Sequence, residues 1–203
     1  MKTSILLCGV GGQGILLAAK VIGAAAAAAG FPVVANETHG MAQRGGCVKA
    51  QVKFGEKATG PLIAEGEADV LASMECIEAL RWAHFLKPGG PAAVSLHRVV
   101  PVTVSSGAAI YPSDAEDRLA RTFPNLVALN CDAEATAMGN ARLANSILVG
   151  MLSRALPSIP DEAWREAFRT SVKPAFLQAN LAAFDRGARF QSQKLQPSAP
   201  SDA

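Results

Sequence analysis

The chain has 203 residues, half of them apolar but 5% aromatic, which suits one domain with a core of Ala, Val, Leu and Ile. A formal net charge of +2, carried by scattered basic residues, does not indicate a nucleic-acid-binding protein. The most apolar stretch, residues 21–29, is mostly alanine and lies beside Lys20 and Gly30, so we expect no membrane-spanning segment.

The start of the chain and its cysteines indicate the compartment. Residues 1–4 lead directly into an apolar strand, without the longer apolar segment of a signal peptide, so we expect a cytoplasmic protein with reduced thiols. The cysteines at 8, 47, 76 and 131 form no C-x-x-C pair and have no histidine at ligand spacing. This spacing argues against zinc and against an iron–sulfur cluster bound by this chain alone. Cys8 and Cys131 are predicted to be small core residues.

A glycine turn at residues 9–14 follows the apolar strand 5–8 and precedes an alanine-rich helix predicted over 15–29, with Gly30 as its end. A strand that turns through glycines into a helix presents free N–H groups and the positive end of the helix dipole, where anions bind. The spacing also fits the dinucleotide pattern G-x-G-x-x-G. Three interpretations stay open: a nucleotide-phosphate site, a site for another anion or a partner's backbone, or a tight turn alone. The ligand- or partner-facing candidates are Gly9, Gly11, Gly12, Gln13 and Gly14.

A polar, glycine-broken loop at residues 37–46 lies between strands predicted over 31–35 and 47–54, the latter with one wet face. Glu37 closes its strand where a Rossmann carboxylate contacts a ribose hydroxyl. Arg44 can bind a carboxylate or phosphate in a bidentate way, or simply pair with Glu37 in a solvated loop. His39 is expected to be a hydrogen-bonded spacer. The candidates from this loop are Glu37, Thr38, His39, Gln43, Arg44, Gly45 and Gly46.

The remaining elements alternate between strand and helix. Strands are predicted at 69–74, 92–95 and 126–130, with short β candidates at 99–104 and 108–111, and helices at 75–85, 114–121, 141–156 and 160–184. Pro174 should break the last helix near Lys173. Glu65 and Glu67 should be solvated, and Asn145 should bridge to another segment. We expect an α/β, Rossmann-like fold with a mainly parallel sheet, helices on both faces and a helical C-terminal portion. One domain should span residues 1–187, followed by a disordered tail at 188–203.

The motifs together resemble a known family. Gly-Val-Gly-Gly-Gln-Gly at 9–14 is followed by Glu-Thr-His-Gly-Met-Ala-Gln-Arg-Gly-Gly at 37–46, Pro-Leu-Ile at 61–63 and Glu-Gly-Glu-Ala-Asp-Val-Leu at 65–71. Gly-Asn-Ala-Arg at 139–142, with Asn145, extends the likeness. Over about residues 3–187 the chain closely resembles the gamma-type subunit or domain of 2-oxoacid:ferredoxin oxidoreductases. The version at 37–46 looks like that of the beta subunit of indolepyruvate ferredoxin oxidoreductases.

This resemblance implies a division of labour. Thiamine diphosphate, Mg and 4Fe-4S clusters would lie in a large partner subunit, with no cofactor and no catalytic residue in this chain. The complex would oxidatively decarboxylate an aryl pyruvate with coenzyme A, giving an acyl-CoA and reduced ferredoxin. The loop 37–46 and the glycine turn would face the partner near its substrate or coenzyme A channel, with Arg44 near an anionic group. The alternatives are a self-sufficient NAD- or FAD-binding oxidoreductase domain and a pure assembly subunit.

Overall fold

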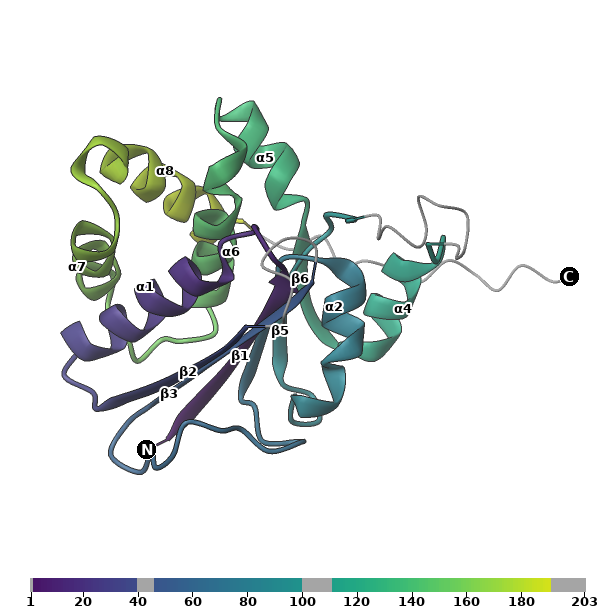
Figure 1. Cartoon of the computed structure of the whole chain (residues 1–203), viewed down its shortest axis with the longest axis horizontal. Coiled ribbons are helices and arrows are strands. Elements are labelled where there is room, and N and C mark those ends of the chain that lie inside the picture. The colour runs from purple at the N-terminus through teal and green to yellow at the C-terminus, as the bar shows by residue number, and fades with distance from the viewer. Residues whose placement is uncertain (1, 40–45, 100–110, 191–203) are drawn as a thin grey trace, which may run out of the picture.

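The computed structural model describes residues 2–39, 46–99 and 111–190, which form a six-stranded sheet with helices on both sides (Figure 1). The strands are β1 (Thr3–Val10), β2 (Val33–His39), β3 (Cys47–Phe54), β4 (Val70–Ser73), β5 (Pro91–Ser95) and β6 (Asn125–Leu129). The helices are α1 (Ile15–Ala28), α2 (Cys76–Arg81), α4 (Ala115–Thr122), α5 (Cys131–Ala137), α6 (Ala144–Ser153), α7 (Asp161–Ser171) and α8 (Leu177–Ala188). Single 3-10 turns, η1 (Ala83–Phe85), η2 (Ala141–Leu143) and η3 (Pro174–Phe176), precede or follow some of them.

The sheet order is β2-β3-β1-β4-β5-β6, and β1, β4, β5 and β6 run parallel. β3 is the exception, because it pairs antiparallel with both β1 and β2. The expected Rossmann-like, mainly parallel sheet is therefore confirmed, with one antiparallel strand inserted between β1 and β2. All carboxyl ends except that of β3 meet at one edge of the sheet.

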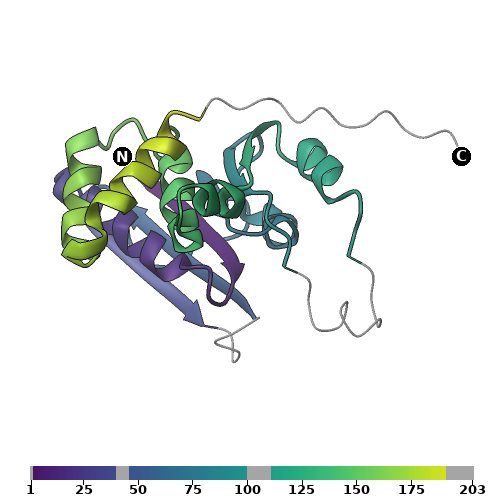
Figure 2. The ribbon, with the colours of Figure 1, turned by 90° about the horizontal axis from the view of Figure 1, so that it is seen from above.

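The alternation of side chains along β1 divides the core into two halves. Ile5 and Leu7 are buried on the face covered by α1 and α5–α8, whereas Leu6 is buried on the face covered by α2 and α4. Figures 1 and 2 show these two groups of helices on opposite sides of the sheet. Because successive strand residues point to opposite faces, one apolar strand serves both cores.

Most predicted elements are confirmed, and several differ in their bounds. Helix α1 ends where expected: Gly30 has φ 85°, and the amides of Gly30 and Phe31 donate to the carbonyls of Ala27 and Ala26, as in a Schellman motif. β2 continues to His39 because it pairs with β3 along its whole length. The predicted helix 75–85 is instead α2 followed by η1, with Glu75 as its cap.

The C-terminal half differs in similar ways. The predicted helix 141–156 is η2 followed by α6, and the break predicted at Pro174 separates α7 from η3 and α8. α5 was not predicted. The β candidates 99–104 and 108–111 lie outside the described residues, apart from Val99 and Tyr111, which belong to no strand. α8 ends at Ala188, one residue beyond the expected domain, and the rest of the predicted tail beyond Phe190 lies outside the described residues.

The predicted wet face of β3 is wrong at Gln51 and Lys53, whereas Lys49 on the same face is partly exposed. Gln51 and Lys53 are 2% and 4% exposed, because residues 55–69 fold back over them. The ammonium of Lys53 donates to the carbonyl of Leu62, and the side-chain oxygen of Gln51 accepts the amide of Ile63 at 2.5 Å. The same segment leaves Glu65 solvated as expected, with 75% of its side chain exposed. The polar groups of these buried strand residues therefore form hydrogen bonds with the backbone of a loop instead of with water.

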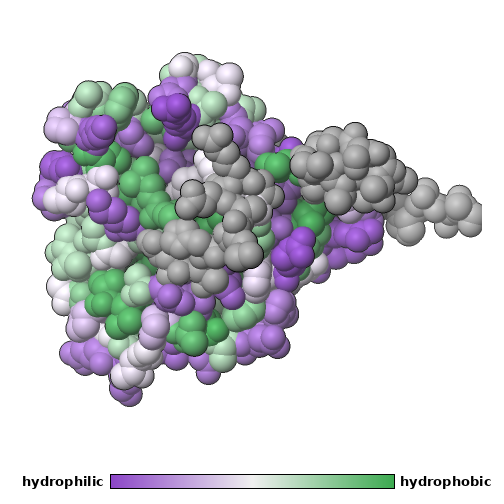
Figure 3. All heavy atoms as spheres, in the orientation of Figure 1, coloured by the Kyte–Doolittle hydropathy of each residue, from purple (hydrophilic) through white to green (hydrophobic). Residues whose placement is uncertain are grey.

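The surface is mixed. On the face shown in Figure 3, hydrophobic patches are small and are separated by hydrophilic residues. Among the helices that the structure describes, none combines the length and the apolar character needed to span a bilayer.

Candidate functional site

The carboxyl edge of the sheet gathers the polar motifs. The glycine turn follows β1, the last residues of β2 and the first of β3 lie beside it, and Glu75, His97 and Asp132 follow β4, β5 and β6. In open α/β sheets ligands and partners bind at this edge, because strand ends and helix starts leave backbone groups there. We take this edge as the candidate site.

Gln13 closes the glycine turn from inside. Its side-chain oxygen accepts the amide of Val10 at 2.7 Å, and its side-chain nitrogen donates to the carbonyl of Met74 at 3.0 Å. Gly9 is required by this packing, because a Cβ there would lie 2.8 Å from the Gln13 oxygen. Gln13 therefore links the ends of β1 and β4 and uses a turn N–H that a ligand would otherwise need.

Gly14 caps α1 in the left-handed region, with φ 78°. Its carbonyl accepts a hydrogen bond of 3.3 Å from the side-chain amide of Asn145, at the start of α6. A Cβ on Gly14 would lie 2.5 Å from that same nitrogen, so the contact needs glycine for both reasons. The bridging role predicted for Asn145 is confirmed.

The structure brings the start of the glycine turn to the end of the polar loop. The amide of Gly11 donates to the carbonyl of Gly46 at 2.8 Å, which continues the β1–β3 ladder by one further pair. Gly12, with φ 101°, is exposed at the tip of the turn. Two of the predicted site motifs therefore lie side by side.

The loop residues themselves are placed in part. Glu37, Thr38 and His39 are the last residues of β2, where their backbones pair with Ala50, Lys49 and Val48 of β3. Gln43, Arg44 and Gly45 lie outside the described residues. The site roles predicted for the residues of this loop stay predictions.

The position of β2 differs from that in a dinucleotide-binding fold. There the second strand lies directly beside the first, so that its terminal carboxylate reaches a ribose bound on the glycine turn. Here β3 separates them, which places the end of β2 about 9–10 Å from β1, or two strand spacings. Together with the occupied amides of Val10 and Gly11, this arrangement does not favour the NAD or FAD interpretation.

Two buried glutamates, Glu75 at the N-cap of α2 and Glu78 within it, were not predicted. Glu75, 1% exposed, accepts the amide of Glu78 at 2.9 Å with one oxygen and the hydroxyl of Tyr111 at 2.6 Å with the other. Burial, with the hydrogen bond to Glu75, raises the pKa of Tyr111 above its ordinary value. The position of Glu75, directly after a buried strand, is the signal that could have found it.

Glu78 is the centre of a second cluster. Its carboxylate accepts hydrogen bonds from Arg81 at 3.0 Å and from the Trp82 indole at 3.2 Å. The Lys49 ammonium lies 4.2 Å from the centre of the Trp82 ring, a cation–π contact. Burial raises the pKa of Cys47, beside Trp82, to about 11. These groups fasten α2 to the first residues of β3, which hold the end of the polar loop.

A histidine–carboxylate pair lies where β5 and β6 end. His97 Nδ1 is 3.4 Å from a carboxylate oxygen of Asp132, in the first turn of α5. Burial raises the pKa of Asp132, while His97 acts in the opposite direction. The hydroxyl of Ser95 accepts the amide of Cys131 at 3.2 Å and ties the two strand ends together.

The cysteines do not form a cluster site. Cys8, Cys76 and Cys131 are fully buried, as expected for Cys8 and Cys131, and all four thiols are free. Burial raises the pKa of Cys76 and of Cys131 to about 12 each, so both thiols are protonated at neutral pH. The described residues also contain no group of three or more His, Cys, Asp or Glu side chains arranged to hold a metal.

Comparison with known proteins identifies the family. The profile described as "Pyruvate ferredoxin/flavodoxin oxidoreductase" matches residues 4–190. The chain belongs to this family. It is 41% identical to the indolepyruvate oxidoreductase subunit IorB of Thermococcus kodakarensis and 42% identical to that of Pyrococcus horikoshii, in each case over 95% of this chain and 97% of the relative.

A solved structure of this oxidoreductase family shows the same fold. The gamma subunit of a keto/oxoacid ferredoxin oxidoreductase from Geobacter sulfurreducens matches with a TM-score of 0.68 and 24% identity, over 92% of this chain and 94% of that one. The resemblance to gamma-type subunits, and to their indolepyruvate branch, is therefore confirmed.

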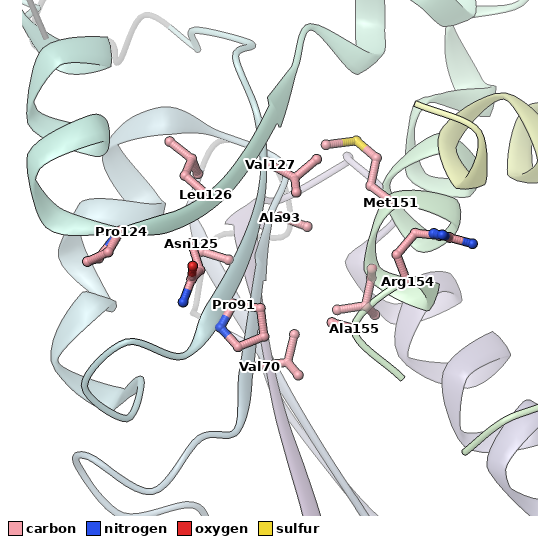
Figure 4. A pocket seen from close by; sticks show the side chains of 12 residues that line it. Val70, Pro91, Ala93, Pro124, Asn125, Leu126, Val127, Met151, Arg154 and Ala155 are labelled. Atoms are coloured by element: carbon pink, nitrogen blue, oxygen red, sulfur yellow. The ribbon is translucent and has the colours of Figure 1, made fainter. Parts of the chain in front are cut away.

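A cavity also lies away from the carboxyl edge of the sheet. A cavity of about 390 Å³ lies between β6 and α6, near the amino ends of β4 and β5 (Figure 4). Twelve residues line it, and Arg154 is the charged one among them; Figure 4 shows Val127 and Met151 flanking it. Because it lies away from the carboxyl edge and offers no acid–base pair, we do not assign the candidate site to it.

Proposed function

We propose that this chain is the small subunit of an indolepyruvate (aryl-pyruvate) ferredoxin oxidoreductase. In this proposal a large subunit carries thiamine diphosphate, Mg and the 4Fe-4S clusters, and the complex converts an aryl pyruvate and coenzyme A to an acyl-CoA while reducing ferredoxin. Thiamine diphosphate supplies the stabilisation of the carbanion left by decarboxylation. In this proposal the chain contributes a docking surface and charged side chains next to the active site of the large subunit.

The observation that carries the proposal is the likeness to relatives named indolepyruvate oxidoreductase subunit IorB along almost their entire length. A match over 97% of each relative leaves no large part of the relatives without a counterpart here. The cysteine positions support the assignment of clusters to the partner, because the four cysteines form no C-x-x-C pair and the described residues contain no group of three or more metal-ligating side chains.

The geometry of the carboxyl edge supports a docking role for it. The glycine turn is held by Gln13, Asn145 and Gly46, so it presents a fixed backbone shape with little side-chain bulk. A rigid, small-residue surface allows close approach of another backbone at a low entropic cost. In this proposal the turn and the loop 37–46 face the large subunit near its substrate or coenzyme A channel.

Arg44 is proposed to interact with an anionic group at that interface, since a guanidinium binds carboxylates and phosphates in a bidentate way. The test is Arg44→Ala in the assembled complex, with Arg121→Ala, an exposed arginine on α4, as the control. We expect a higher KM for coenzyme A or the oxoacid with Arg44→Ala and unchanged kinetics with the control. Unchanged assembly and unchanged kinetics with Arg44→Ala would remove this role.

The function as a whole is tested by co-expressing the chain with candidate large subunits. The purified complex should reduce an acceptor dye with indolepyruvate and coenzyme A, and more slowly with 2-oxoglutarate. Binding of NAD or FAD to the isolated chain, seen as a rise in melting temperature, would instead favour a self-sufficient oxidoreductase domain. A complex whose activity tolerates every substitution in the loop 37–46 would indicate a pure assembly subunit.

A further inference from the structure

A second hollow, of about 340 Å³, lies between the first turn of α1, the turn that joins α5 to α6, and the turn that joins α7 to α8. We call its rim the α5–α8 surface and define it by four exposed side chains: Met138, Arg142, Lys173 and Phe176. Arg142 belongs to the motif at 139–142, which neither the glycine turn nor the loop 37–46 explains. Arg142, Lys173 and Phe176 line the hollow, and Met138 precedes the lining residue Asn140 by two positions.

The α5–α8 surface has an exposed apolar part. Phe176 is 53% exposed and Met138 is 37% exposed, and only Leu62 joins them as an exposed large hydrophobic among the described residues. A single exposed apolar residue is ordinary on a soluble protein. Phe176 lines the hollow, and Met138 and Arg142 lie two positions before and after its lining residue Asn140; Met, Phe and Arg are residue types enriched in protein interfaces.

The same surface carries two positive charges, those of Arg142 and Lys173. Across residues 2–39, 46–99 and 111–190, no carboxylate lies within ion-pair distance of Arg142 or Lys173. The neighbouring helices differ: Arg165, Arg169 and Arg186 pair with acidic side chains at 2.7 to 3.0 Å. The two unpaired cations therefore leave this corner of the molecule able to bind an anionic group.

The side chains of this surface stand on a rigid support. The backbone carbonyl of Phe176 accepts a hydrogen bond of 2.8 Å from the side-chain nitrogen of Asn180, a residue that is 7% exposed. The side-chain oxygen of Asn180 accepts a hydrogen bond of 2.7 Å from the hydroxyl of Ser146. Ser146 follows Asn145, whose side chain donates to the carbonyl of Gly14. A backbone fixed in this way loses little conformational entropy on binding. The chain of hydrogen bonds also fixes its position relative to the glycine turn.

We propose that the α5–α8 surface docks an acidic segment of the large subunit, which places carboxylates at Arg142 and Lys173 and an apolar side chain against Phe176 and Met138. The inference rests on the proposed function, because that function supplies the partner. It adds a second contact region to the carboxyl edge and names the chemistry that the partner offers there. Opposite charges at such a rim accelerate association, and the apolar contact slows dissociation.

The test measures binding of the purified chain to the large subunit at two salt concentrations, about 50 and 300 mM, a range over which charge screening changes strongly. The variants are Arg142→Glu/Lys173→Glu and Phe176→Ala. The matched controls are Lys57→Glu/Arg121→Glu, two exposed cations outside this surface, of which Arg121 lies on α4 across the sheet from α8, and Leu62→Ala, an exposed leucine. Circular dichroism of each variant verifies that the fold is unchanged.

We expect the charge-reversal pair to raise Kd at least about 100-fold at low salt, as two interactions of roughly tenfold each would. That difference should shrink at high salt, and Phe176→Ala should raise Kd about tenfold at both concentrations. Unchanged binding by the charge-reversal pair, or equal losses in the controls, would overturn the assignment while leaving the proposed function standing. Failure of the unsubstituted chain to bind any large subunit would overturn both.

Discussion

The side-chain amide of Asn145 donates to the carbonyl of Gly14, a hydrogen bond of 3.3 Å between residues 131 positions apart in the chain. It joins the glycine turn at the start of α1 to the start of α6, and through Ser146 and Asn180 to α8. The site at the carboxyl edge therefore depends on packing between the first helix of the chain, α1, and the C-terminal helices α6 and α8. This relationship gives a direct test of how the turn is held.

Gly14→Ala should destabilise the protein by about 2–5 kcal/mol, since alanine at φ 78° is strained and its Cβ would lie 2.5 Å from the Asn145 nitrogen. Gly89→Ala is the control, because Gly89 has a similar φ of 71° and nothing within 4 Å of the added Cβ. Its cost should be the backbone strain alone, about 1–2 kcal/mol. Urea unfolding gives both values.

A second experiment repeats Gly14→Ala in an Asn145→Ala background. There the loss of unfolding free energy caused by Gly14→Ala should fall to that caused by Gly89→Ala. An unchanged loss would show that the contact between the added Cβ and Asn145 is unimportant.

Helices α6 and α8 approach so closely that glycine is needed on both. A Cβ on Gly150 would lie 2.1 Å from the carbonyl oxygen of Phe184, and one on Gly187 would lie 2.0 Å from that of Ile147. We expect Gly150→Ala to cost about 3 kcal/mol or more, because α8 must move.

Gly23→Ala provides the opposite case. Gly23 lies inside α1, and its added Cβ would make an ordinary contact of 3.6 Å with Val33. Because alanine stabilises helices relative to glycine, this change should raise the free energy of unfolding by about 0.5–1 kcal/mol. Thermal unfolding of the two variants side by side decides the matter, and the same sign for both would contradict this account of the α6–α8 contact.

The hydrogen bond from Tyr111 to the buried carboxylate of Glu75 should be strongly stabilising. Tyr111→Phe removes the hydroxyl, 2.6 Å from Glu75, and leaves a buried carboxyl oxygen without that donor, so we expect a loss of about 1–3 kcal/mol. A double-mutant cycle with Glu75→Gln isolates the pair. A coupling energy near zero would show that the two groups do not interact in solution.

Stability should fall at alkaline pH because buried thiols resist ionisation. Burial raises the pKa of Cys131 to about 12, whereas a thiol in the unfolded chain ionises near about 8.5. Above that pH the unfolded chain binds fewer protons than the folded one, so the free energy of unfolding declines until the folded thiol itself ionises. Each such thiol contributes a slope of at most about 1.4 kcal/mol per pH unit.

Cys131→Ala is the variant that tests this linkage. Between pH 9.5 and 10.5, its free energy of unfolding should decline less steeply than that of the unsubstituted chain, by up to about 1.4 kcal/mol per pH unit. Urea unfolding at several pH values measures the two slopes. Equal slopes would mean that Cys131 ionises in the folded protein as readily as in the unfolded one.

Local patterns in the sequence predicted much of the fold. The glycine turn, Gly30 as a helix end and the break at Pro174 depend on residues close in the chain, so they could be predicted from short segments. The insertion of β3 between β1 and β2 could not, because alternation identifies a strand but not its neighbours. α5 is a seven-residue helix of Ala, Asp, Glu, Thr and Cys, too short for a clear apolar period.

The site was predicted less completely than the fold. The motifs at 9–14 and 37–46 are adjacent as their strand-end positions suggested, through the Gly11–Gly46 hydrogen bond. Glu75 and Lys53 were missed because charged residues are usually exposed, and their burial depends on distant partners, Tyr111 and Leu62. Such contacts are set by tertiary packing and leave no local pattern.

The most direct test of the central claim compares the purified chain with its complex. The account predicts that the chain alone is colourless and inactive toward indolepyruvate with coenzyme A, and that addition of the large subunit yields oxoacid-dependent reduction of ferredoxin or an acceptor dye. A visible iron–sulfur or flavin spectrum of the chain alone, or turnover of an oxoacid without the partner, would contradict it.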